Sequence, residues 1–197
     1  MAKNKNLIRN STFNFQLKGR PSIFIGFYIL LGTLLIQLTI EGFTTDGSPF
    51  GFLTVNYLET FIFIITLLVF LLSLLGLFFG NRRFQRKIGN KIWNRNSKKS
   101  IWVLILLVTL LYSSLFYLLR IGEEQFIIST FLIGYGFILM ILNFSKTIIL
   151  YLFSIASILL GFIPLFVDGT GYYSLIILGV SHFVFAYLNR SINENKI

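Results

Sequence analysis

The sequence predicts an all-α integral membrane protein with six transmembrane helices in up-down antiparallel hairpins. Three observations lead to this fold class: an apolar composition, six charge-free stretches of spanning length, and a one-sided distribution of basic residues. Of the 197 residues, 55% are hydrophobic and only 12% are charged. About a quarter of the residues of a soluble domain are charged, so this chain lacks the polar surface to cover a globule in water. We therefore expect a lipid bilayer around it.

Six stretches without a formal charge are long enough to cross the hydrocarbon core, which takes about 20 residues in a helix. They lack the alternation of a strand, and lipid admits only helices or closed barrels, so we expect helices. In chain order the expected spans are residues 22–40, 60–80, 101–119, 125–143, 147–167 and 172–189.

The connections divide the chain into five parts. The basic segment 1–21 precedes two helices in 22–80, which enclose an outer loop at 41–59. A basic linker (81–100) leads to four helices in 101–189 and a tail at 190–197. The first span is longer than a signal-peptide core and has no small-residue cleavage site after it, so we interpret it as an uncleaved anchor. The turns between the last four helices are short, which predicts that successive helices are antiparallel neighbours.

The basic residues predict the orientation in the membrane. If the N-terminus is cytoplasmic, sixteen of the 17 Lys and Arg residues fall on the cytoplasmic side, and only Arg120 falls outside. Six of the acids then lie outside, among them Glu41, Glu59 and Glu123. This pattern follows the positive-inside rule and places both termini in the cytoplasm.

The linker NRRFQRKIGNKIWNRNSKKS carries eight basic residues and no acid. Phe84, Ile88 and Ile92 recur every four residues, which is compatible with an interfacial helix. Because Gly89 weakens such a helix, a solvated basic loop is an equal alternative. Nucleic-acid binding is not expected, because no reader motif accompanies the charge. We expect anionic lipid headgroups as the partners of these side chains: Arg82, Arg83, Arg86, Lys87, Lys91, Arg95, Lys98 and Lys99.

His182 is the lone histidine and the lone ionisable group in the middle of a span. Such a group is a functional candidate by default, but a neutral imidazole that bonds a neighbouring helix is the interpretation that we favour. The chain has no Cys, no second His and no acid inside a span. We therefore expect no metal site, no cofactor and no catalytic set.

Two sets of small residues share the spacing i, i+3, i+7, which places them on one face of a helix and permits close helix approach. Packing inside the monomer is the favoured interpretation, ahead of a partner site. The sets are Ser73, Gly76 and Gly80, and Ser154, Ser157 and Gly161.

These observations favour an accessory, assembly or scaffold subunit of a membrane complex, bound to other membrane subunits or to itself, and not an enzyme. The alternative is a permease or solute-binding subunit for an uncharged small molecule. That alternative requires polar residues from different helices to line one cavity. The residues to examine are Gln37, Thr109, Ser113, Ser114, Tyr135, Ser157 and His182.

The composition also indicates the kind of genome and membrane. The chain has 23 Phe but only three Ala residues, as AT-rich codons favour. We expect the plasma membrane of a bacterium or archaeon, or the inner membrane of an organelle.

Overall fold

The computed structural model describes Leu17 and residues 19–44, 55–88, 95–142, 148–167 and 169–194. This part of the chain is helical throughout apart from its turns, which confirms the predicted all-α class. Its elements are α2 (Gly19–Thr44), α3 (Val55–Ile88), α4 (Arg95–Arg120), the 3₁₀ turn η1 (Glu124–Phe126), α5 (Ile127–Ile141), α6 (Ile148–Phe166) and α7 (Gly171–Glu194).

All six expected spans correspond to helices, and five of these are long and apolar enough to cross a membrane. The exception is α5, whose 15 residues are fewer than the about 20 that a straight span needs. Its N-terminal end is shortened by the turn that precedes it. Gly122 has φ 77°, and the amides of Gly122 and Glu123 bond the carbonyls of Leu119 and Leu118, which closes α4 with a Schellman motif. The chain then makes η1 before α5 begins.

Helix α3 is longer than expected. It has 34 residues and continues without a break from the expected end at Gly80 through residues 81–88. Helix α4 likewise begins within the basic linker, at Arg95. Residues 81–88 of the linker therefore belong to α3, and residues 95–100 belong to α4. Only residues 89–94 of the linker lie outside the described residues.

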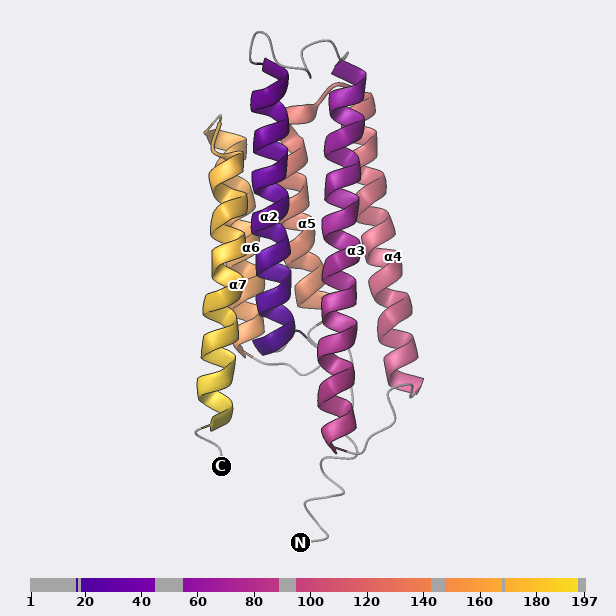
Figure 1. Cartoon of the computed structure of the whole chain (residues 1–197), viewed down its shortest axis with the longest axis vertical. Coiled ribbons are helices and arrows are strands. Elements are labelled where there is room, and N and C mark those ends of the chain that lie inside the picture. The colour runs from indigo at the N-terminus through magenta and orange to yellow at the C-terminus, as the bar shows by residue number, and fades with distance from the viewer. Residues whose placement is uncertain are drawn as a thin grey trace, which may run out of the picture.

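The helices form two layers (Figure 1). The first layer contains α7, α2 and α3, with α2 in the middle, and the second contains α6, α5 and α4, with α5 in the middle. The layers approach most closely along α6 and α7. The start of α2, the end of α3, the start of α4 and the end of α7 lie at one end of the bundle. We call this the basic end, because Arg20, Arg82, Lys98 and Lys99 belong to it.

Neighbouring helices within a layer run antiparallel and approach closely at glycines. A Cβ atom added to Gly26 of α2 would lie 2.7 Å from the carbonyl oxygen of Gly179 in α7. A Cβ atom on Gly136 of α5 would lie 2.7 Å from the carbonyl oxygen of Ser154 in α6. These backbones touch, and any larger residue would separate the two helices.

Helices α3 and α4 are joined differently, by aromatic rings. The ring of Tyr112 in α4 lies 5.4 Å from Phe70 and 6.1 Å from Phe63, both in α3. Its hydroxyl donates a hydrogen bond of 2.9 Å to the carbonyl oxygen of Thr66. Large side chains thus hold these two helices at a distance, and this spacing leaves room between the layers.

Candidate functional site: a buried histidine beside an apolar cavity

The site is built around His182, whose side chain is completely buried where the two layers meet. The hydroxyl of Ser22 in α2 lies 2.9 Å from Nδ1, and the hydroxyl of Tyr135 in α5 lies 2.7 Å from Nε2. The ring of Phe153 in α6 packs edge-on against the imidazole, with 4.8 Å between centroids. Residues of four helices therefore meet at His182.

The hydrogen bonds define the protonation state of the imidazole. The Ser22 hydroxyl has a single proton, which it donates to the carbonyl oxygen of His182 at 2.9 Å. Nδ1 must then be the donor to Ser22 Oγ, and Nε2 must accept the proton of the Tyr135 hydroxyl. A neutral imidazole with its proton on Nδ1 satisfies every group in this cluster. The arrangement explains how an ionisable side chain is accommodated at this depth.

This position decides what His182 can do chemically. A general base has to come within hydrogen-bond reach of its substrate. Both nitrogens of His182 are already occupied, and His182 lines neither of the two cavities described below. The imidazole is suited to join α2, α5 and α7.

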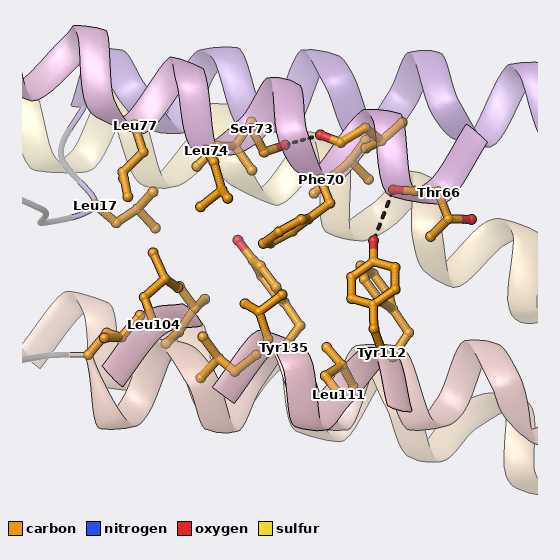
Figure 2. A pocket seen from close by; sticks show the side chains of 18 of the residues that line it. Leu17, Thr66, Phe70, Ser73, Leu74, Leu77, Leu104, Leu111, Tyr112 and Tyr135 are labelled. Carbon is orange, nitrogen blue, oxygen red and sulfur yellow. Dashed lines mark hydrogen bonds between the residues drawn. The ribbon is translucent and has the colours of Figure 1, made fainter. Parts of the chain in front are cut away.

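The Tyr135 hydroxyl group faces the first cavity, which has a volume of about 120 Å³ and lies between the two layers (Figure 2). Four hydroxyl side chains line it. Tyr135 donates to His182, as argued above; Thr66 donates to Ile62, Ser73 to Val69 and Tyr112 to Thr66, all three to backbone carbonyls. The rest of the described lining is aliphatic or aromatic. Each of these four hydroxyl groups already donates its proton to a protein acceptor.

A second cavity, of about 280 Å³, continues from the first toward the opposite end of the bundle. The two share five lining residues, namely Ile29, Thr66, Val69, Tyr112 and Phe131. The second cavity ends near Ile40 and Glu59, and Glu59 is the one charged residue among the described residues that line it. Together the cavities follow α2, α3, α4 and α5 along much of their length.

The small residues predicted for helix packing lie against other helices of the same chain. Gly76 faces Phe24 and Gly80 faces Pro21, both from α2, while the Ser73 hydroxyl bonds its own helix. In α6, Gly161 faces Leu132 and Ile133 of α5. Ser154 and Ser157 are buried beside it, and each donates to the carbonyl four residues earlier. The glycines of both faces are thus covered by helices of the same chain, whereas Ser73 lines the first cavity.

The polar residues examined for the permease hypothesis converge only in part. Thr109 and Ser114 bond carbonyls of their own helix, as Ser157 does, and Gln37 bonds Glu41 one turn away. Ser113 is exposed. Tyr135 and His182 bond across helices, and of the whole set only Tyr135 lines a cavity.

Of the basic side chains predicted to contact lipid headgroups, three are described. Arg82 is half-buried, and Lys98 and Lys99 are exposed, all at the basic end. The side chains of the other five lie outside the described residues: Arg83, Arg86, Lys87, Lys91 and Arg95.

Sequence reasoning missed Ser22, the partner of His182. A signal was present, because Gly19, Ser22 and Gly26 have the same i, i+3, i+7 spacing as the two sets singled out above. This third face packs against α7, where Gly19 meets Ala186 and Gly26 meets Gly179. The pairing of Ser22 with His182 itself, across 160 positions, has no local signature.

Comparison with known proteins identifies no relative. No protein-family model matches the chain, and neither a curated protein nor a solved structure is significantly similar to it. The site is therefore interpreted from its own geometry.

Proposed function

We propose that this chain is an accessory, assembly or scaffold subunit of a membrane complex, without catalysis of its own. The observation that carries the proposal is that most buried polar side chains of the described residues are paired inside the protein, with Ser129 Oγ of α5 as the exception. His182 bonds Ser22 and Tyr135. Thr109 of α4 and Ser154 of α6 bond carbonyls of their own helices, and Tyr112 of α4 bonds a carbonyl of α3. Because a substrate needs unpaired donors or acceptors for acid–base chemistry, this pattern favours a structural role.

Both termini are proposed to be cytoplasmic, with six passes through the membrane. The shared position of the α2 start and the α7 end supports this orientation (Figure 1). The described basic side chains at that end, Arg20, Arg82, Lys98 and Lys99, agree with the positive-inside rule. A plasma membrane of a bacterium or archaeon, or the inner membrane of an organelle, of an AT-rich genome remains the proposed location.

The test is purification of the tagged chain from its native membrane in a mild detergent, followed by native mass spectrometry. The expected result is one species of fixed stoichiometry that is heavier than the 22.7 kDa chain and that re-forms when its purified components are mixed. A 22.7 kDa monomer in every detergent, from membranes in which the wild type is functional, would contradict the proposal.

The variant His182→Gln adds a sharper measurement. Its amide oxygen can still accept the Tyr135 proton, so assembly and thermal stability are expected to change little, and far less than in His182→Leu. Loss of the physiological activity in a folded and assembled His182→Gln protein would replace the subunit proposal with a His-dependent site.

The cavities between the layers favour a second candidate, a permease or solute-binding subunit for an uncharged small molecule. Because the described lining of the cavities has almost no charged side chains, they do not favour the binding of a charged solute. An uncharged solute that raises the Tm of the wild type, but not of a Ser73→Phe variant whose ring fills the first cavity, would favour this candidate.

A further inference from the structure

We propose that the first cavity holds part of one acyl chain of an anionic phospholipid, whose headgroup lies at the basic end between α3 and α4. This inference needs only that the bundle spans a bilayer, so it is independent of any protein partner. It assigns a ligand class to a cavity that the subunit proposal does not use.

The chemistry of the lining selects an apolar occupant. The hydroxyls of Thr66, Ser73, Tyr112 and Tyr135 donate to protein acceptors, so none of these protons is free for a polar solute. A polar molecule would lose its bonds to water on entry and would gain few in return. A hydrocarbon chain loses no hydrogen bond and gains contact with the aliphatic walls.

The length of the cavity matches one leaflet, and its volume admits part of one acyl chain. On α3 its lining extends from Thr66 to Leu77, a rise of about 16 Å at the helical repeat. One leaflet contributes about half of the roughly 30 Å hydrocarbon core. The volume of about 120 Å³ is slightly below that of an apolar cavity that takes up benzene, about 150 Å³. The cavity therefore holds a segment of about six carbons, and the rest of the acyl chain lies in the bilayer.

The position of the aromatic contacts indicates where the chain enters. The rings that join α3 and α4 belong to Phe63, Phe70, Tyr112 and Phe116, on the far side of the cavity from the basic end. Closer to the basic end, Leu77 of α3 and Leu104 of α4 line the cavity from opposite sides (Figure 2). Both leucines are buried, so in our proposal they move apart to admit the acyl chain from the bilayer between these two helices.

The charges at this end fix the polarity of the lipid. Leu17, Leu77 and Leu104 line the cavity. Within two helical turns of them, Arg20 follows Leu17 and Arg82 follows Leu77. Lys98 and Lys99 precede Leu104 at a similar spacing. The segments 17–21, 77–88 and 95–104 contain no acid. The other end of the cavity system is lined by Glu59. An anionic headgroup is therefore attracted to the basic end and repelled from the opposite one.

The experiment uses the full chain in bilayer nanodiscs with photoactivatable phosphatidylglycerol or phosphatidylcholine that carries a diazirine midway along one acyl chain. Mass spectrometry then maps the adducts. Adducts are expected on the cavity walls of α3, α4 and α5, as well as on the outward faces that any surrounding lipid touches. Ser73→Phe should remove at least four fifths of the wall adducts and leave the outward ones. Thr109→Phe is the matched control, because Thr109 also bonds its own helix but is exposed on α4.

A second arm separates the headgroup from the chain. Each basic side chain near an anionic group strengthens binding by about fivefold, so phosphatidylglycerol should give at least fivefold more wall adducts than phosphatidylcholine. Replacement of Arg82, Lys98 and Lys99 by Gln should abolish this preference, whereas Arg120→Gln, at the opposite end, should preserve it.

Two results would overturn the proposal. Adducts confined to outward faces, or wall adducts that persist in Ser73→Phe, would show that no acyl chain occupies the cavity. Equal labelling by the two lipids in the wild type would refute the anionic headgroup. Val108→Phe fills the cavity from the opposite wall and gives the same test if Ser73→Phe does not fold.

Discussion

The hydroxyl of Tyr135 donates a 2.7 Å hydrogen bond to Nε2 of His182, across 47 positions of the sequence. This bond connects α5 of one layer to α7 of the other. The hydrogen bond between His182 and Ser22 then connects α7 to α2. The sequence favours a neutral imidazole bonded to a neighbouring helix, and in the fold His182 connects three helices through these bonds.

The Tyr135–His182 bond is expected to contribute measurably to stability. In a double-mutant cycle of Tyr135→Phe and His182→Leu, we expect a coupling of about 0.6 kcal/mol and at most about 1.7 kcal/mol, the average and the maximum measured for hydrogen bonds between membrane helices. Unfolding in mixed micelles with increasing dodecyl sulfate gives the free energies.

The matched control for this cycle replaces Tyr135→Phe by Tyr112→Phe. Tyr112 loses its bond to Thr66, not to His182, so its effect should add to that of His182→Leu within about 0.5 kcal/mol. Additivity in the Tyr135 cycle as well would contradict the assignment of this bond.

The glycine contacts predict a rank order of destabilisation. Gly26→Ala and Gly136→Ala place a Cβ atom 2.7 Å from a backbone carbonyl oxygen of the neighbouring helix, so the helices must separate. Gly76→Ala meets the Cβ atom of Phe24 at 3.1 Å and requires a shift of only tenths of an ångström. We expect a loss of about 1–3 kcal/mol for the first two variants and a clearly smaller loss for Gly76→Ala.

Thermal unfolding in one detergent measures this order. Ala156→Leu, which adds volume on an exposed face of α6, is the control and should leave Tm almost unchanged. A Gly26→Ala protein as stable as the control would show that α2 and α7 do not pack as described.

The orientation in the membrane is open to a direct test, because the chain has no cysteine of its own. Single cysteines at the exposed positions Ile121 and Val167 should react with an impermeant thiol reagent added outside intact cells or vesicles. Cysteines at the exposed positions Lys98 and Lys99 should react only after permeabilisation. Reaction of position 98 from outside would reverse the proposed topology.

The sequence by itself determined which segments are helices. Apolar runs without charge and without the alternation of a strand form helices in lipid, since a helix satisfies its own backbone hydrogen bonds. This is why each expected span corresponds to a helix. The sequence did not determine where each helix ends. Helix α3 has 34 residues and continues into the basic linker, because Arg and Lys are good helix formers and nothing at Gly80 stops the helix.

Only the tertiary structure decided which helix faces meet. The spacing of Gly76 and Gly80 marks a face that packs closely, but the fact that α2 covers it depends on how the whole bundle assembles. The partners of His182 lie 160 and 47 positions away, and the cavity exists because the rings of Tyr112, Phe63 and Phe70 keep α3 and α4 apart. Hydrophobic matching to lipid is local along the chain and can be read from it, whereas close packing depends on the shapes of several helices at once.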